Sequence, residues 1–504
     1  MGGKTLITLF LRNLSHAFGR FEWVCHQLDY LANCLREEDV RHFLDELPLA
    51  CSLDETYERA LQEIAPPNWE FVRWLLQCVA VASRPLHVDE LAEFFTFNFH
   101  AGPVPQFRED WRSKHSLSGV LSSYSSLVSV VKIGKSDIVQ FPHIALRDFL
   151  TSNRFTEKCD SLSENFHISM IGAHTLVARA CLGMLLHLNT TITRHSLAKF
   201  PLAEYAARHW AYHACFEGVS QTMEVEEGVK QLFDPTKPHF TIWTWIYDPI
   251  HPRTQCEQGE IPSSSSRNPL HYAAFLGLRA VVEFLVTEHS EDVDSQDIDD
   301  KSTPLHLASG AGHVEVAHFL VEHRASITVR DKDGLTPLHW ASLQGRVEVT
   351  CLLIEYDADV GIQDKAGLTP LHWAYRQGRG DVARILISCG ADRTIKDKFG
   401  LTPLAWASQQ GRVDLAYFLA SYGTGATVQD QDGSASAMAP WQEISAAELM
   451  TGERPLTVNP QLGPKTSSRG TRARNGDTGG QADLQGIWRK LSAIAGRVVT
   501  RCAR

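Results

Sequence analysis

The sequence lacks the signatures of several classes of protein. Its 11 cysteines are scattered over 504 residues without a Cys-x-x-Cys pair, which argues against a disulfide scaffold or a zinc module and favours a reducing compartment. No apolar run approaches about 18 residues, so we expect no membrane-spanning helix. The short apolar stretch at residues 6–11 has no small-residue cleavage site after it, so we expect no signal peptide. These absences predict a cytoplasmic protein, with the nucleus as the alternative location.

A complete phosphate-binding loop, Gly-x-x-x-x-Gly-Lys-Ser/Thr, is also absent. The Gly-Lys-Thr at residues 3–5 has only Met1 and Gly2 before it, so the first glycine of the loop and its preceding strand have no place. The Gly-Lys-Ser at residues 134–136 has Ser129 in place of the first glycine and lies between two predicted strands. We therefore predict that the chain is not an enzyme and has no catalytic residues and no cofactor.

The charge balance limits the choice of partner. Lys and Arg number 48 against 59 Asp and Glu, which gives a net charge of -11 and argues against a protein that coats nucleic acid. With 43% hydrophobic and 21% charged residues, the composition is that of a globular protein, and the length predicts about three domains.

A short motif recurs in the second half of the chain. Asn-Pro-Leu-His ends at His271, Thr-Pro-Leu-His follows at residues 303–306, 336–339 and 369–372, and Thr-Pro-Leu-Ala occupies residues 402–405. The motif prolines are spaced by 35, 33, 33 and 33 residues, which is the ankyrin period.

The chemistry of one unit supports this interpretation. Thr336 is placed to cap a helix whose first turn accepts Pro337, and Gly345 is placed to end it. A second helix with an apolar stripe follows, and Asp333-Gly334 is a turn signal between units. Residues 267–425 closely resemble five copies of the ankyrin repeat family, which implies a stack of helical pairs with short hairpins. The second copy departs from the pattern, because Lys301 replaces the turn glycine, and we interpret residues after 425 as a decayed sixth copy.

The first half of the chain is predicted to be mainly helical. Helices are expected at residues 57–64, 68–82 and 87–95, followed by strands at 126–133 and 137–141, which is a winged-helix pattern. Residues 166–214 keep helical spacing and predict two stacked helical hairpins. The acidic residues Asp89, Glu90 and Glu93 of the third helix would repel phosphates, so we expect no binding to DNA.

This half resembles the carboxy-terminal part of fungal NACHT and ankyrin proteins, which are signalling ATPases. The resemblance spans roughly residues 21–248 and is carried by the short stretches at residues 21–28, 53–59, 84–86, 139–150 and 202–210. It implies that these residues join a nucleotide-binding domain to a repeat sensor. That domain is expected to be missing here, with residues 1–47 as the remnant of its helical end.

Histidines and tryptophans recur in register within the repeats. The histidines are His271, His306, His339 and His372, and we expect each to make a hydrogen bond inside the stack instead of binding a metal. The tryptophans are Trp340, Trp373 and Trp406, and we expect them to be buried between neighbouring units.

The hairpin tips and the turns between helices are the positions that vary within the ankyrin family and so carry recognition. We therefore expect a protein partner to contact the third, fourth and fifth units, with Phe399 as an apolar anchor and the lysines steering an acidic partner. The candidate partner-binding residues are Lys332, Asp333, Leu335, Leu343, Gln344, Lys365, Leu368, Arg376, Gln377, Lys398, Phe399, Leu401, Gln409 and Gln410.

The carboxy-terminal tail has a composition of its own. It is poor in apolar residues up to about residue 482, which predicts disorder. From Trp441 to Arg504 there are 10 Lys and Arg against 5 Asp and Glu, and residues 483–504 predict a basic amphipathic helix. This helix could contact an anionic membrane or a partner.

The predicted fold is mainly α, with a winged-helix and helical-hairpin region followed by an ankyrin α-solenoid. The expected domains are 1–47, a NACHT remnant; 48–157, winged-helix-like; 158–252, helical hairpins; 253–266, a linker; 267–425, the ankyrin repeats; 426–482, a disordered linker; and 483–504, the basic helix. The predicted function is a non-enzymatic protein-interaction scaffold, an ankyrin sensor of a fungal NACHT-type signalling protein. Two alternatives stay open: a fragment of a complete ATPase switch, and a membrane-associated ankyrin adaptor.

Overall fold

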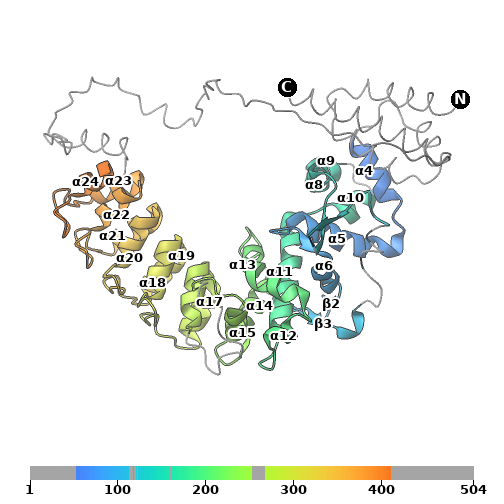
Figure 1. The fold of residues 1–504 in the computed structure, drawn as a ribbon, viewed down its shortest axis with the longest axis horizontal. Helices are drawn as coiled ribbons and strands as arrows, with labels where there is room; N and C mark the ends of the chain where they lie inside the picture. The colour runs from blue at the N-terminus through green and yellow to red at the C-terminus, as the bar shows by residue number, and fades with distance from the viewer. Residues whose placement is uncertain are drawn as a thin grey trace, which may run out of the picture. The chain divides into compact units, whose positions relative to one another are not determined.

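The computed structural model describes residues 53–112, 117, 121, 123–134, 136–157, 161–251 and 267–409 (Figure 1). Several predicted segments lie outside these residues: the amino-terminal remnant at 1–47, the linker at 253–266, the disordered stretch at 426–482 and the basic helix at 483–504. Lys4, Lys135 and Gln410 also lie outside them. The described part is mainly helical and carries the repeats in the second half of the chain, as predicted.

The first segment combines helices with a small sheet. Its helices are α4 (Leu53–Gln62), η1 (Pro66–Asn68), α5 (Trp69–Val81), α6 (Val88–Phe94), η2 (Glu109–Trp111), α8 (Ile144–Thr151) and α9 (Asn153–Thr156). Its strands are β1 (Leu86–His87), β2 (Phe97–Asn98), β3 (Gln106–Phe107), β4 (Ser129–Ile133) and β5 (Ser136–Gln140). The predicted helices and the predicted strand pair are thus confirmed, whereas the two-residue strands β1, β2 and β3 were not predicted.

Two antiparallel sheets form in this segment. The larger has the order β1-β5-β4, with Leu86 opposite Val139 and Val130 also opposite Val139 on the other side. The smaller pairs β2 with β3. Gly134, with φ of 63°, follows β4, and Ser136 begins β5 opposite Ile133, so these two residues belong to a hairpin and not to a phosphate loop.

The next segment is a set of packed helices. They are α10 (Ser161–Phe166), α11 (Met170–His187), α12 (Arg194–Leu197), α13 (Pro201–Ala214), α14 (Met223–Phe233) and α15 (His239–Ile246). Helix α11 packs against α5, α13 and α14, and its core face includes Ala173, Val177 and Leu185.

One expectation about this segment needs correction. An 18-residue window within Ser161–His187 has a mean hydropathy of 1.5, so this segment is long and apolar enough to cross a membrane, contrary to the sequence-based expectation. Most of the apolar window, 61%, is buried inside the protein, as in the central helix of a packed core. Ser, His and Gly residues interrupt the apolar residues of this segment, so the sequence shows no continuous apolar run.

Each repeat consists of an inner helix that opens with the Pro-Leu motif and an outer helix. The pairs are α16 (Pro269–Leu276) and α17 (Arg279–Thr287), α18 (Pro304–Ala311) and α19 (Val314–Glu322), α20 (Pro337–Gln344) and α21 (Val347–Glu355), α22 (Pro370–Arg376) and α23 (Gly380–Ser388), and α24 (Pro403–Gln409). Successive inner helices pack on one another in the order α16, α18, α20, α22 and α24. Figure 1 shows these pairs following one another along the chain.

The motif threonine and histidine explain why the inner helices α18, α20 and α22 start where they do. The backbone N–H of Thr336 donates to Nδ1 of His339 at 3.1 Å, so that nitrogen carries no proton. The other ring nitrogen, Nε2, therefore donates to the carbonyl of Leu368 in the following unit at 3.2 Å. One histidine thus caps its own helix and ties two units together, which confirms the predicted hydrogen bond inside the stack.

Candidate partner-binding surface

The hairpins between repeats are organised by one aspartate each. The carboxylate of Asp331 accepts the backbone N–H groups of Asp333 at 2.9 Å and Leu335 at 2.8 Å through Oδ1. Its other oxygen accepts the indole N–H of Trp340 at 2.8 Å. Asp364 with Trp373 and Asp397 with Trp406 repeat this arrangement at 2.9 and 2.7 Å. The oxygens of these carboxylates already accept hydrogen bonds within their own repeat, so they are not free to bind a partner.

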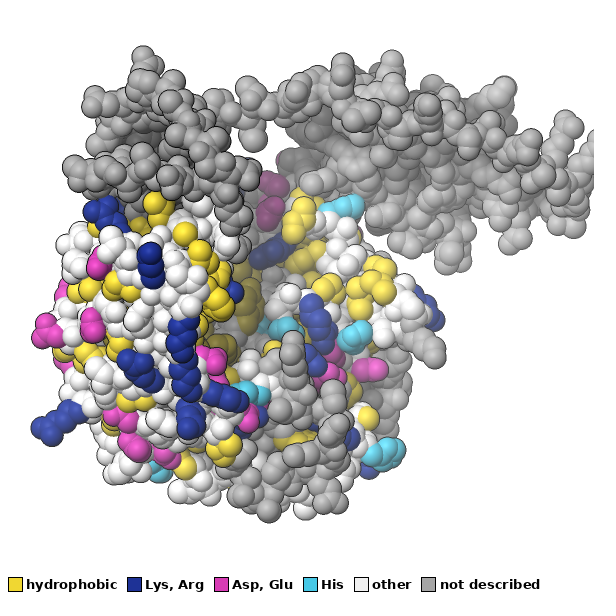
Figure 2. Space-filling model, turned by 60° about the vertical axis from the view of Figure 1, so that its left-hand side comes forward, with side chains coloured by type: hydrophobic (Ala, Val, Ile, Leu, Met, Phe, Trp, Pro, Cys, Tyr) yellow, Lys and Arg dark blue, Asp and Glu magenta, His cyan; other side chains and the backbone are white. Residues whose placement is uncertain are grey.

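Neighbouring hairpins are joined through their tips. The N–H of Lys332 donates to the carbonyl of Asp300, that of Lys365 to Asp333, and that of Lys398 to Ala366, at 2.7, 3.0 and 3.1 Å. The three lysines therefore occupy one line along the edge of the repeats, and all three are exposed. Within the described residues, none of them forms an ion pair. In Figure 2, Lys and Arg side chains lie in a row on the visible face of the repeats.

Most of the predicted contact positions are accessible. Phe399 is 76% exposed at the tip of the last described hairpin. The exposed positions also include Lys332, Asp333, Gln344, Lys365, Gln377, Lys398 and Gln409, and the half-buried ones are Leu343, Arg376 and Leu401. These side chains form the surface that a partner could reach.

Two predicted contact residues require correction. Leu335 is 9% exposed and Leu368 is 4% exposed, so both are buried at the base of their hairpins. The following hairpin covers them, because its aspartate-centred turn packs against the preceding unit. The corresponding Leu401 is half-buried, and the residues that would follow it in the stack lie outside the described part.

The tryptophans are less buried than the repeat pattern predicts, although the ring of Trp340 does face Gly310 of the preceding unit. Trp340, Trp373 and Trp406 are each half-buried, with the indole nitrogen directed to the hairpin aspartate and part of the ring left accessible. The repeat pattern located them in register but could not show that the N–H bond holds them at the surface of the inner helices.

The acidic residues of α6 also have a role that the sequence did not reveal. Glu90 and Glu93 are 5% and 3% exposed, and they pair with Arg84 at 2.6 Å and with Arg112 at 2.5 Å. Glu93 also accepts the N–H of Leu202 at the start of α13 at 2.8 Å. Glu93 therefore links α6 to α13, and neither Glu90 nor Glu93 faces outward, so the charge argument against DNA rests on the exposed Asp89 alone.

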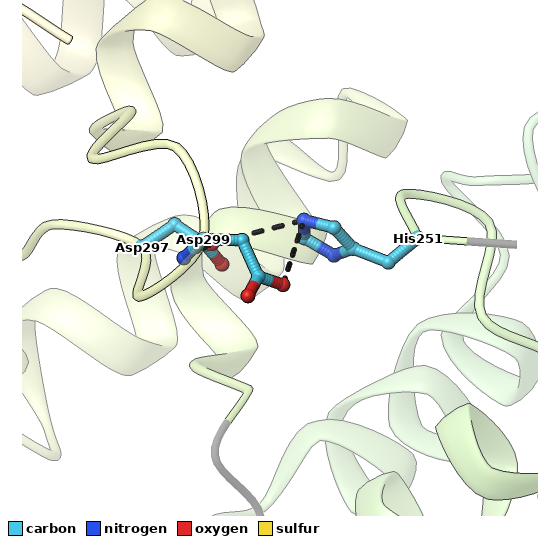
Figure 3. A group of neighbouring side chains, drawn as sticks. All are labelled: His251, Asp297 and Asp299. Carbon is cyan, nitrogen blue, oxygen red and sulfur yellow. Dashed lines mark hydrogen bonds and ion pairs between the residues drawn. The ribbon is translucent and has the colours of Figure 1, made fainter. Parts of the chain in front are cut away.

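Within the described residues, one group of His and Asp side chains is close enough to be tested as a metal site. His251 Nε2 lies 3.7 Å from Asp297 Oδ1 and 3.6 Å from Asp299 Oδ2 (Figure 3). However, the guanidinium of Arg267 contacts the same Asp299 oxygen at 2.7 Å and Asp248 at 3.3 Å. A permanent cation already pairs with Asp248 and Asp299, so we describe the group as an ion-pair network and assign no metal to it.

The repeat histidines likewise do not form a metal site. Burial lowers the pKa of His339 to about 4 and also lowers the pKa values of His306 and His372, so these rings are neutral at pH 7. Both ring nitrogens of each already have hydrogen-bond partners. No lone pair is therefore available to a metal ion on these three residues.

Comparison with known families agrees with the repeat assignment. The family description "Ankyrin repeats (3 copies)" matches residues 270–364 and 352–432. Ankyrin repeats are therefore present in this chain, and this part is a protein-interaction module.

Three relatives share sequence with the chain. Azaphilone pigments biosynthesis cluster protein L of Monascus ruber is 25% identical over 316 residues, which cover 58% of this chain and 64% of that protein. Rabankyrin-5 of Mus musculus is 34% identical over 91 residues, 18% of this chain and 8% of its own length. Inhibitor of Bruton tyrosine kinase of Xenopus laevis is 32% identical over 79 residues, 16% of this chain and 6% of its own length. The chain spans less than two thirds of each of these relatives.

Proposed function

We propose that this chain is a non-enzymatic scaffold whose ankyrin repeats bind a protein partner along the hairpin tips and inner turns of the third to fifth units. The observation that carries the proposal is the exposure of Phe399, 76%, beside a line of exposed lysines that form no ion pair within the described residues. An apolar side chain held at an exposed turn adds nothing to the core, whereas it can bury a large area on contact with a partner.

The helices before the repeats would relay the state of the repeats to the rest of the protein. Supporting this role, Tyr272 of α16 donates a hydrogen bond to Asp248 at 2.8 Å and packs against Phe240 and Trp243, with ring centroids 5.2 and 5.8 Å away. The sheet order β1-β5-β4 supports the winged-helix interpretation of the first segment. We further propose a NACHT-type signalling role in the cytoplasm, on the strength of the sequence resemblance of residues 21–248. We do not propose nucleic-acid binding, since α6 is packed against α13.

Capture of partners by the full chain tests this function. The wild-type chain, immobilised in a cell lysate, should retain a protein that the double variant Phe399→Ala with Arg376→Ala retains at least tenfold less, about 1.4 kcal/mol. Met223→Ala is the matched control, because Met223 is 78% exposed on α14. If the double variant retained as much of the partner protein as the wild type, the partner would have to contact another face of the chain.

A further inference from the structure

We propose that Trp373, Arg376 and Trp406 form a carboxylate seat, a preformed site that binds the Glu or Asp side chain of an acidic segment in the protein partner. The proposal rests on the proposed function and defines the chemistry of the partner. All three residues are half-buried and belong to the inner helices α22 and α24.

The geometry of Arg376 is that of a preorganised anion receptor. Its guanidinium carbon lies 4.9 Å from the ring centre of Trp373 and 5.2 Å from that of Trp406. Contacts with two indole rings restrict the rotamers of the side chain and remove water from its faces. The N–H donors at the edge of the guanidinium have no hydrogen-bond or ion-pair acceptor among the residues that the structure describes.

The two rings are themselves held in place. Each indole N–H donates to a hairpin aspartate, Trp373 to Asp364 at 2.9 Å and Trp406 to Asp397 at 2.7 Å. The other oxygen of each aspartate accepts backbone N–H groups of the hairpin, so each ring is bonded to a carboxylate that the turn itself fixes. Little conformational entropy would therefore be lost when an anion binds.

The carboxylate seat is specific to the junction between the fourth and fifth units, as the equivalent positions in the other units show. Gly310, Leu343 and Arg376 occupy equivalent positions 33 residues apart. A Cβ added at Gly310 would lie 2.8 Å from the ring of Trp340, so this position faces the tryptophan of the next unit. In the fourth unit the position carries a charged group, whereas the first three units have Phe275, Gly310 and Leu343 there, and the fifth has Gln409. Duplication of a packing motif alone would not place a cation there.

The surroundings favour a carboxylate of a peptide as the occupant. Lys365 and Lys398 directly follow the aspartates that hold the two rings, and both are exposed. The backbone N–H of the exposed Phe399 donates to Asp397, whose other oxygen holds Trp406, so this apolar residue belongs to the same hairpin that supports the seat. The carboxylates of Asp364 and Asp397 would repel a doubly charged phosphate more strongly than a singly charged carboxylate, and a carboxylate matches one edge of the guanidinium.

Peptide selection against the full chain tests the seat. A random library of displayed 16-residue peptides is selected on the wild-type chain, on Arg376→Gln and on Arg384→Gln. The last is the matched control, because Arg384 lies on the outer helix α23 and the substitution removes the same charge. The best peptide is then synthesised with its acidic residues intact and with each Glu or Asp changed to Gln or Asn, and its Kd is measured by the quenching of tryptophan fluorescence.

We expect peptides enriched in Glu and Asp, and a loss of affinity of at least tenfold on Arg376→Gln or on removal of the peptide carboxylates. Arg384→Gln should stay within twofold of wild type, and Arg376→Lys should not restore binding, because lysine lacks the planar fork. Selected peptides without acidic enrichment, or equal binding by Arg376→Gln, would overturn the seat and leave the scaffold function standing. Tighter binding of a phosphoserine version, or of single-stranded oligodeoxythymidylate, would overturn the carboxylate assignment. If neither peptides nor a lysate protein are retained, the proposed function fails as well.

Discussion

At the scale of the residue, buried histidines tie stability to pH. His174 Nδ1 and His213 Nδ1 lie 3.0 Å apart, and His213 Nε2 lies 3.0 Å from the hydroxyl of Tyr205. Burial lowers the pKa of His174 to about 4 and that of His213 to about 3. Because the unfolded chain binds protons at these residues below about pH 6.5 and the folded chain does not, stability is lost as pH falls from 6.5 toward 4.

We therefore expect the thermal unfolding midpoint to fall steadily between pH 7 and pH 5. Each such histidine contributes a slope of up to about 1.4 kcal/mol per pH unit once its unfolded form is protonated. His213→Gln should make the slope shallower, whereas His100→Gln should not, because the His100 side chain is 83% exposed. Differential scanning calorimetry at several pH values measures this, and a midpoint that is constant from pH 7 to pH 5 would contradict it.

A second residue-scale prediction concerns the indole bond of Trp373. Trp373→Phe keeps an aromatic ring but leaves Asp364, which is 8% exposed, without its indole donor. We expect a loss of about 1 to 2 kcal/mol in the free energy of unfolding. Trp111→Phe is the control, since Trp111 is 46% exposed. Urea denaturation compares the two, and equal losses would mean that the bond to Asp364 contributes nothing.

At the scale of the element, a comparison of two hairpin glycines distinguishes the energetic cost of backbone strain from that of close packing. Gly334 and Gly400 have φ values of 84° and 78°, in the left-handed region that favours glycine. A Cβ at Gly334 would lie 2.9 Å from the backbone nitrogen of Lys365, whereas at Gly400 nothing described lies within 4 Å. Gly334→Ala should therefore destabilise the chain by clearly more than the roughly 1 kcal/mol expected of Gly400→Ala. Thermal melts of the two variants measure this difference. Equal shifts of the unfolding midpoint would show that the neighbouring hairpin moves to make room for the Cβ at residue 334.

Elements with strong local signals could be predicted from the sequence, and side-chain environments that depend on the neighbouring unit could not. The Pro-Leu motif, repeated at a fixed period, predicted every inner helix, because capping and helix start are encoded within four residues. The burial of Leu335 and the half-exposure of Trp373 depend on the next hairpin, which no local pattern describes. Strand β1 has only two residues, and it forms because β5 lies beside it. Lys301, in the place of a turn glycine, nonetheless adopts φ of 60°, so the turn geometry is imposed by the stack.

The carboxylate seat shows the same limit. Arg376, Lys365 and Lys398 were predicted as contact residues from their variable positions in the repeat. The sequence could not show that the rings of Trp373 and Trp406 both contact Arg376, since that requires the orientation of two adjacent units. Repeat register thus predicts which residues are candidates, and packing between units decides what they can bind.

At the scale of the whole molecule, the repeats and the helices before them are joined through one buried carboxylate. Asp248 is 4% exposed and accepts hydrogen bonds from the hydroxyl of Tyr272 at 2.8 Å and from the N–H groups of Ile250 and His251 at 3.0 and 2.8 Å. It also lies 3.3 Å from Arg267. Burial and this carboxylate raise the pKa of Tyr272, so the hydroxyl keeps its proton and remains a donor.

We expect Asp248→Ala to separate the unfolding of the two parts. The substitution leaves Tyr272 and Arg267 without their acceptor at a junction that also contains Phe240 and Trp243, so the loss should reach about 3 kcal/mol and fall on the interface. A repeat stack that loses the contact at its first unit unfolds from that end. We therefore expect one calorimetric transition for the wild type and two for Asp248→Ala. Asp234→Ala serves as the control, because Asp234 ends α14 and its contacts are with Thr236 and Lys237, away from Tyr272. A single transition with an unchanged midpoint in Asp248→Ala would mean that the aromatic packing on Tyr272 is enough to couple the two parts, and the relay would then have to be sought in those rings.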